Sequence, residues 1–153
     1  MISTQLTAIS TKFNANDSRV VVRGNELTYV AHALLSSLSK NRLLEALDAV
    51  LQRGCLHLEE AGFWYLTDED LSDLDDEEVP PFCVRMRVVT EVAYIPEPDF
   101  ARLMLRVAQT FISGATDCDH PMLREPWWPE LLDAAARLEA QVKALDDDEA
   151  GVP

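Results

Sequence analysis

Four segments of the chain carry apolar residues at the spacing of an amphipathic helix, in which every third or fourth residue faces the core. They span residues 27–38, 43–51, 100–111 and 131–145. The apolar phase slips at the polar sequence of residues 39–42, so we expect the first two segments to be separate helices. Pro129 stands where the first turn of the last helix tolerates proline. The pattern predicts four helices.

Strand-like patterns lie between these helices. Residues 19–23 form a short run that predicts a strand, and residues 55–59 and 63–66 flank a glycine-containing turn, which predicts a β-hairpin. In residues 82–95, valine and methionine alternate with arginine. This period predicts one long, half-buried strand that bends or carries a bulge. Residues 113–126 contain one glycine and two prolines and are expected to form a loop.

These elements predict an α/β domain of the α+β type, with about four helices packed on a small antiparallel sheet. The hairpin, the valine-rich strand and the segment near residues 20–22 are expected to form the sheet. The chain of 153 residues suits one domain, because a domain of this length buries roughly two thirds of its unfolded surface. We expect a flexible N-terminal arm at residues 1–17, a single globular domain at residues 18–145 and a disordered acidic tail at residues 146–153.

Residues 68–78, which we call the acidic run, form the most highly charged stretch. Eight carboxylates in eleven residues repel one another, which favours an extended loop or a frayed, charged helix. They are Asp68, Glu69, Asp70, Asp73, Asp75, Asp76, Glu77 and Glu78. The whole chain has a net charge of −14, from 27 acidic and 13 basic residues. Such a field disfavours direct binding of nucleic acid and accelerates the encounter with a basic protein.

Cysteine number and hydropathy bear on the compartment. Cys55, Cys83 and Cys118 are an odd number of cysteines at wide spacings and form no closed disulfide framework. The first residues lack the charged segment and apolar segment of a secretory signal, and no apolar run approaches the length of a membrane span. We therefore expect a cytoplasmic protein that does not bind membranes.

The acidic run begins like a calcium-binding loop. Asp68 and Asp70 have the alternation that an EF-hand requires. The sixth position, however, is Asp73 where the sharp turn needs glycine, and the twelfth is Val79 where a glutamate should complete the ligand shell. A solvated loop, or a docking surface for a cationic partner, is the better interpretation.

Residues 117–120 read Asp-Cys-Asp-His and concentrate metal-ligand types in one place. Cys55 or His57 could complete a site if the fold brought them close, but zinc sites usually combine two separated pairs of ligands and nothing in this spacing requires one. Cys118 and His120 are also a poor nucleophile and base, because the two members of such a dyad normally come from distant parts of the sequence. We expect no metal, no cofactor and no catalytic residue, and therefore no enzyme.

Tryptophans are the candidate anchors for a partner. Trp127 and Trp128 are adjacent, so at most one of them can face the core directly. Strand alternation places Trp64 on the opposite face from both of its neighbours. Core packing is the default for such residues, yet tryptophan is enriched at binding hot spots. Trp64 and Trp128 are therefore kept as partner-binding candidates beside the acidic run.

The order of helix, helix, glycine stop and hairpin resembles a winged helix-turn-helix. The sequence LDAVLQRGCLHLEEAGFWYLTDEDL, residues 47–71, is similar to a recognition helix followed by its wing. The resemblance implies DNA binding, for which basic or amide side chains are needed along the second helix and near the wing. Here Lys40, Asn41 and Arg42 precede the helix body, and the hairpin leads into the acidic run. This charge distribution disfavours a DNA-binding role.

Size, charge and the lack of a catalytic motif favour an acidic binding protein that neutralises a basic protein partner. Its most concrete form is a bacterial, cytoplasmic immunity protein, or antitoxin, that inhibits a cationic nuclease-type toxin. Two alternatives stay open. A secretion or effector chaperone needs an exposed apolar groove and a two-fold dimer, and a nucleic-acid mimic needs two rows of carboxylates at phosphate spacing. Monomer and homodimer are both compatible with the sequence.

Overall fold

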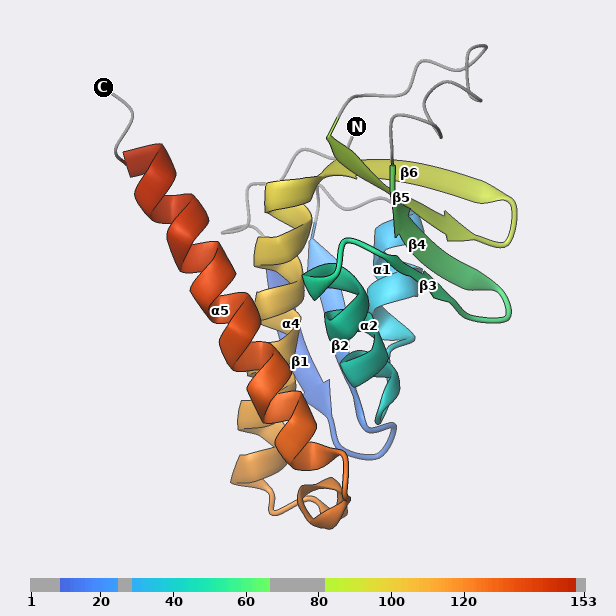
Figure 1. Cartoon of the computed structure of the whole chain (residues 1–153). Coiled ribbons are helices and arrows are strands. Elements are labelled where there is room, and N and C mark those ends of the chain that lie inside the picture. The colour runs from blue at the N-terminus through green and yellow to red at the C-terminus, as the bar shows by residue number, and fades with distance from the viewer. Residues whose placement is uncertain (1–8, 25–28, 67–81, 151–153) are drawn as a thin grey trace.

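The structure, a computed structural model, describes residues 9–24, 29–66 and 82–150 (Figure 1). In these residues it contains four α-helices and two antiparallel sheets, which confirms the predicted α+β class. The helices are α1 (Tyr29–Ser36), α2 (Arg42–Leu51), α4 (Glu97–Asp117) and α5 (Trp128–Ala150), with a short 3-10 helix, η2 (Pro121–Arg124), before α5. The strands are β1 (Ile9–Asn14), β2 (Arg19–Gly24), β3 (Cys55–His57), β4 (Ala61–Tyr65), β5 (Cys83–Val88) and β6 (Glu91–Pro96).

Both sheets are built from hairpins. β1 pairs with β2, and the larger sheet has the order β3-β4-β5-β6, so that each strand lies beside its neighbour in sequence. The strand predicted at residues 19–23 is confirmed as β2, although it belongs to the small sheet and not to the sheet of the hairpin. The predicted hairpin is confirmed as β3 and β4, although Gly62, which was expected in its turn, lies on β4. Gly62 is required on β4 because a Cβ at this position would overlap the backbone oxygen of Leu56.

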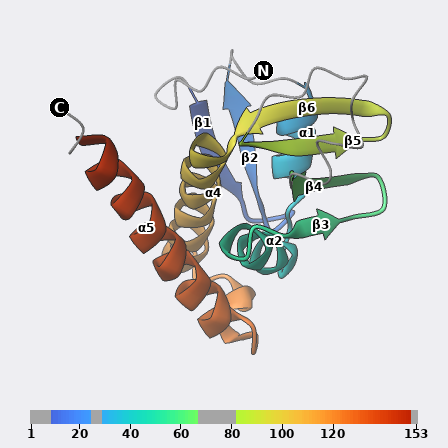
Figure 2. The same cartoon turned by 45° about the horizontal axis from the view of Figure 1, so that its top comes forward.

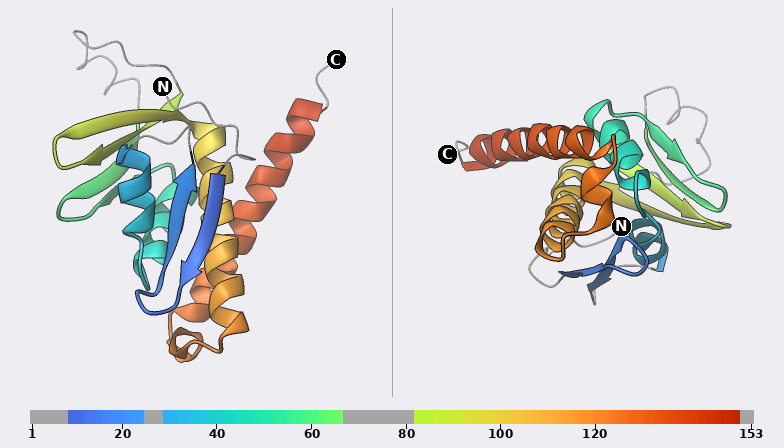
Figure 3. Two further views of the ribbon diagram at one scale, coloured as in Figure 1. Left: turned by 180° about the vertical axis from the view of Figure 1, so that it is seen from behind. Right: turned by 90° about the horizontal axis from the view of Figure 1, so that it is seen from below.

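The core lies between the two sheets and the helices. α1 contacts β2 of the small sheet and β5 and β6 of the large one, so it is held between the sheets (Figure 3). From α4, Phe100 packs on Phe63 with a distance of 4.9 Å between ring centroids. Phe63, Val84 and Met86 are completely buried on this face of the large sheet. Helix periodicity and strand alternation thus converge on one apolar core.

α5 is the last helix, and it packs along α2 and α4. Leu131, Leu138 and Val142 form its buried stripe, as the spacing predicts. The C-terminal end of α5 projects beyond the rest of the described fold (Figure 2). Among the described residues, no helix is both long enough and apolar enough to cross a membrane.

The prediction of a single long strand at residues 82–95 is wrong. The structure divides this segment into β5 and β6, which pair with each other and place Val88 opposite Glu91. Val89 lies in the turn with a φ of 56°. Valine is rarely found in this left-handed region, and an alternating valine-rich pattern is typical of a strand. The sequence therefore lacks the usual signal of a hairpin turn.

The prediction of a loop at residues 113–126 is also wrong in part. α4 continues to Asp117, and η2 occupies Pro121–Arg124. Gly114 indicated a loop, but in the structure it lies inside the helix, where a Cβ would overlap the side chain of Phe13. The glycine therefore permits a close approach of β1 to α4. This reason is tertiary and cannot be recognised in a local pattern.

The ends of the described elements differ from the expected domain limits. β1 begins at Ile9, within the segment expected to be a flexible arm, and α5 continues to Ala150, within the segment expected to be a disordered tail. Ile9 is 2% exposed, and the ring of Phe13 packs edge-on against Phe111 at 5.5 Å. The first strand therefore contributes to the core. Residues 1–8 and 151–153 lie outside the described residues.

Candidate functional site

The acidic run lies outside the described residues, and Leu66 and Phe82 are the nearest described residues on either side of it. β4 and β5 are adjacent antiparallel strands with Tyr65 opposite Val84. Leu66 and Phe82 therefore lie at the same end of the large sheet. Residues 67–81 contain eight of the 27 acidic residues and none of the 13 basic residues. The acidic run is therefore joined to the described fold at this end of the large sheet.

An apolar groove opens beside Phe82, between α2, β4, α4 and α5. Its volume is about 400 Å³, and its apolar lining comes from Val50, Tyr65, Phe82, Pro98, Ala101 and Leu145. Phe82 is 78% exposed, more than any other large hydrophobic residue that the structure describes. Its carbonyl oxygen accepts a hydrogen bond of 3.0 Å from the N–H of Glu97, which ties its backbone to the start of α4. We call this site the Phe82 groove.

An ion pair forms the polar part of the Phe82 groove. Nε and Nη2 of Arg53 donate to the two carboxylate oxygens of Glu97 at 2.7 and 3.1 Å. The Arg53 guanidinium also lies over the ring of Tyr65, 5.6 Å from its centroid. The hydrogen bond and the charge of Glu97 raise the pKa of Arg53 above its ordinary value. Arg53 therefore stays charged near neutral pH, and its contact with Glu97 forms one wall of the groove.

Burial controls the protonation of two groups near this wall. It raises the pKa of Tyr65 strongly, and the charge of Glu97 adds to the effect while Arg53 opposes it. Burial is also the main reason why the pKa of Cys83 is raised, followed by the charge of Glu97. Both groups keep their protons near neutral pH, which makes the phenol a poor base and the thiol a poor nucleophile. What the Phe82 groove offers a partner is apolar contact area beside fixed charges.

Trp64 lies on the face of the large sheet that points away from the core, which we call the outer sheet face. The strand register aligns Cys55, Trp64, Arg85 and Tyr94 in one row across the four strands. The guanidinium carbon of Arg85 is 5.0 Å from the centroid of Trp64 and 6.0 Å from that of Tyr94. His57 stacks on Trp64 with a distance of 6.4 Å between centroids. The predicted anchor Trp64 is thus a surface residue, half-buried by its own neighbours.

Trp128 occupies the core. It is 6% exposed and stacks on Phe111 with a distance of 6.1 Å between ring centroids. Trp127 is half-buried beside it. Trp128 offers a partner almost no surface, so it is not part of the interface that we propose below.

The loop of residues 117–120 has a structural role through His120. The N–H of Met122 donates to Nδ1 of His120 at 3.1 Å, which places the proton of the neutral ring on Nε2. Nε2 then donates to the carbonyl oxygen of Ala15 at 3.0 Å and lies 3.3 Å from Oγ of Ser18. Both ring nitrogens therefore hold the turn between β1 and β2 against η2.

The residues that could complete a metal site with this loop are placed elsewhere. Cys55 and His57 lie on β3, whereas His120 contacts the turn between β1 and β2. Asp119 pairs with Arg124 at 2.9 Å. In the described part of the chain, no group of three or more His, Cys, Asp or Glu residues could hold a metal ion.

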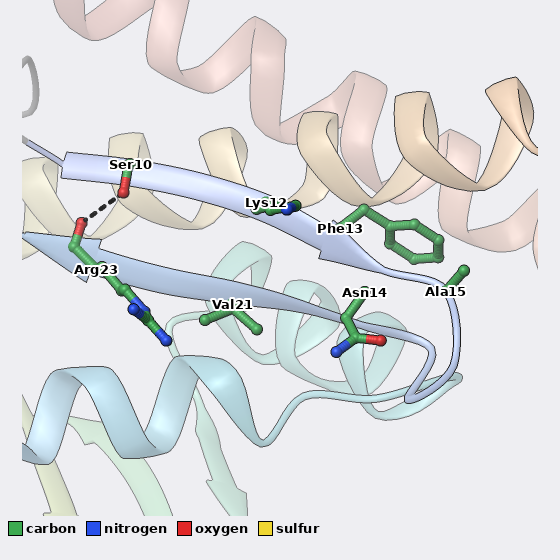
Figure 4. A pocket seen from close by; sticks show the side chains of 7 residues that line it. All are labelled: Ser10, Lys12, Phe13, Asn14, Ala15, Val21 and Arg23. Atoms are coloured by element: carbon green, nitrogen blue, oxygen red, sulfur yellow. Dashed lines mark hydrogen bonds between the residues drawn. The ribbon is translucent and has the colours of Figure 1, made fainter.

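The exposed face of the β1–β2 hairpin is hollowed and basic (Figure 4). This cavity of about 520 Å³ includes Lys12 and Arg23 in its lining. Oγ of Ser10 donates to the carbonyl oxygen of Arg23 across the hairpin, at 3.4 Å. Another cavity of about 490 Å³, between α2 and α5, is acidic, with Asp48, Glu130 and Asp133 in its lining. Arg137 also lines the second cavity and pairs with Asp133 at 3.0 Å, so this cavity is acidic only on balance.

Comparisons with known proteins identify no relative. No family model, no curated protein and no solved structure matches the chain. The function must therefore be inferred from the surfaces described above.

Sequence reasoning missed the Phe82 groove and the stack on Arg85. The groove combines residues from five separate segments, so no local pattern could have revealed it. Arg85 and Trp64 are 21 positions apart in the chain but directly opposite in the sheet. Recognising this contact requires the register in which β4 pairs with β5. The long segment between the two strands, residues 67–81, gives no local sequence signal of that register.

Proposed function

We propose that this protein is an acidic, non-catalytic binding protein that neutralises a basic protein partner. The observation that carries the proposal is the position of the Phe82 groove. It opens at the end of the sheet where the chain enters and leaves the acidic run, so an apolar anchor site and eight carboxylates are neighbours in the chain. One partner surface could use both.

The two parts would contribute different terms to binding. The carboxylates attract a cationic partner over a distance and raise the association rate. They contribute less to affinity, because exposed ion pairs are screened by salt and typically stabilise by about 0.2–1 kcal/mol. Insertion of an apolar side chain beside Phe82 would slow dissociation, since buried aromatic contacts dominate the energetics of most interfaces. An interface of this kind is fast to form and slow to dissociate.

The most specific version of the proposal is a bacterial, cytoplasmic immunity protein that inhibits a cationic nuclease-type toxin. The toxin's basic cleft binds phosphates, and the carboxylates of Asp68, Glu69, Asp70, Asp73, Asp75, Asp76, Glu77 and Glu78 would take their place. Inhibition would follow from occupation of the cleft, without chemistry. Phe82 and Trp64 are the described residues that could supply anchors at either side of the acidic run.

The size of the Phe82 groove favours a folded partner over an extended client. Its volume of about 400 Å³ is near the lower limit of typical small-molecule pockets, which span about 300–1,000 Å³. Such a groove accommodates one or two side chains. A secretion chaperone that holds a long apolar segment would need a larger surface.

The proposal is tested by capture and inhibition. The tagged protein is mixed with extract of its source cells, eluted with a salt gradient, and the released proteins are identified by mass spectrometry. We expect one basic protein, whose purified activity is lost at equimolar amounts of this chain. A captured protein whose activity is unaffected at saturation would contradict neutralisation.

A further inference from the structure

The described side chains of the outer sheet face are half-buried or exposed. α1 and α4 contact β5 and β6, and the completely buried residues Phe63, Val84 and Met86 point to that side of the sheet. On the other side, Trp64, Arg85 and Tyr94 are half-buried, and Cys55 and His57 are exposed. A flat row of two aromatic rings and a cation is therefore open to contact.

This face is positive although the protein is strongly negative. Arg85 and Arg87 lie next but one to each other on β5, and their side chains share the outer sheet face. Nη1 of Arg87 donates to the carbonyl oxygen of Val89 at 2.9 Å. Glu91, the first residue of β6, is exposed but pairs with Val88, which places it on the other side of the sheet from Arg85 and Arg87.

Arg85 differs from Arg53 and Arg102 in having no ion-pair partner in the described part of the chain. Arg53 pairs with Glu97, and Arg102 pairs with Asp99 and Asp146. No carboxylate of the described residues pairs with Arg85, and its Nε is buried without a hydrogen-bond partner. A buried donor without an acceptor carries a desolvation cost. Arg85 as a whole is half-buried, so a ligand would reach the part of its guanidinium that stays exposed and not the covered Nε.

The two aromatic rings prepare Arg85 for an anion. Trp64 and Tyr94 lie on either side of Arg85 in the row and cover the guanidinium by cation–π contact. A carboxylate can approach in the guanidinium plane and accept two parallel hydrogen bonds. Because the side chain is already held, little rotamer entropy is lost when the anion binds.

The charge of the whole chain decides between the candidate anions. Nucleic acid would meet a net charge of −14 along its length, so the field opposes it. A second copy docked face to face would bring Arg85 and Arg87 of both copies together, and like charges repel. A protein that is basic overall but carries a carboxylate at the right position is attracted by the field and also fits Arg85.

We propose that the outer sheet face docks a carboxylate-bearing segment of the basic partner, with the carboxylate on the guanidinium of Arg85 between Trp64 and Tyr94. This inference rests on the proposed function, because it assigns a second contact to the same partner. The acidic run would bind basic residues of the partner and Arg85 would bind its carboxylate, so the two contacts together fix the orientation of the partner. A basic protein without the carboxylate would leave Arg85 desolvated and unpaired, which selects against it.

The test uses two blocked lysine–serine peptides that differ in one central residue, glutamate or glutamine, and measures their affinities by calorimetry. Field attraction alone favours the glutamine peptide, since it carries one more net positive charge. Contact with Arg85 reverses the order, and we expect the glutamate peptide to bind about fivefold tighter to the native protein. In the Arg85→Gln variant the preference for the glutamate peptide should be lost, and the glutamine peptide should bind more tightly than the glutamate peptide.

Lys143→Gln is the matched control, because it removes one positive charge from α5, far from the outer sheet face in sequence, and should keep the preference for glutamate. Thermal melting of both variants verifies that they are folded. Tighter binding of the glutamine peptide to the native protein would overturn the inference, as would an unchanged preference in Arg85→Gln. The proposed function is tested separately, by changing Asp70, Asp73 and Asp76 to lysine. If this change lowers the affinity of the glutamine peptide, the acidic run still attracts basic partners, and the proposed function stands even where the Arg85 contact is overturned.

Discussion

Arg53 and Glu97 are 44 residues apart in the chain, yet the Arg53 guanidinium binds both carboxylate oxygens of Glu97, at 2.7 and 3.1 Å. Arg53 follows α2 with a φ of 50°, and Glu97 is the first residue of α4. The left-handed conformation ends α2 and turns the chain toward β3. The pair thus fastens two helices together at the wall of the Phe82 groove.

Glu97→Gln should lower the free energy of unfolding by about 1 kcal/mol, because a two-point charged contact is replaced by weaker hydrogen bonds. Glu97 is 17% exposed, so its charge is only partly screened by solvent. Urea denaturation measures the difference. Glu91→Gln removes an exposed carboxylate from β6 and should change stability by less than about 0.5 kcal/mol. Equal effects of the two substitutions would show that the ion pair contributes nothing specific.

Tyr65 should make stability depend on pH in alkaline solution. Burial raises the pKa of its phenol in the folded state, so the folded protein holds this proton more tightly than the unfolded chain. The contribution is complete below the ordinary tyrosine pKa of about 10 and is lost as pH rises above it. Tyr65→Phe should therefore reduce the alkaline loss of stability, measured by urea denaturation from neutral to alkaline pH. Identical alkaline slopes for both proteins would contradict this assignment.

Gly114→Ala should destabilise the fold by about 1–3 kcal/mol, because overpacking forces side chains or backbone to move. The added methyl group would overlap Phe13, which packs on Phe111. Gly54→Ala is the matched control, since its Cβ would lie 3.8 Å from the nearest atom, the carbonyl oxygen of Ala49. A neutral effect at Gly114 would mean that β1 does not approach α4 as closely as the structure shows.

Phe82→Ala should weaken binding of the captured partner by about tenfold or more, as expected for an aromatic anchor. The side chain is 78% exposed, so its loss should leave the melting temperature nearly unchanged. Leu132→Ala, which shortens a 42% exposed leucine on α5, controls for a general loss of surface hydrophobicity. Native affinity in Phe82→Ala would remove the Phe82 groove from the interface.

Much of the fold follows from periodicity. The stripes at residues 43–51 and 131–145 predict α2 and α5, and alternation in the sequence Phe63-Trp64-Tyr65 places Trp64 on the opposite face from its two neighbours, as the structure shows. These predictions succeed because burial of one face is a local property of a helix or strand.

What periodicity cannot predict depends on contacts between distant segments. Val89 occupies a turn although its residue type favours strands. Position 114 lies inside a helix and is a glycine because a larger side chain would overlap Phe13. The burial of Trp128 instead of Trp127 depends on how α5 meets α4 near Phe111. The Phe82 groove is of the same kind, because its lining is assembled from distant segments.

The salt dependence of partner binding tests the central claim most directly. We would measure the dissociation constant over a range of salt concentrations for the native protein and for a variant with Asp70, Asp73 and Asp76 changed to lysine. The acidic run predicts weaker binding and a flatter salt dependence in the variant, with an unchanged melting temperature. Equal affinity and equal salt slopes, in a variant that folds normally, would contradict the claim that the acidic run binds the partner.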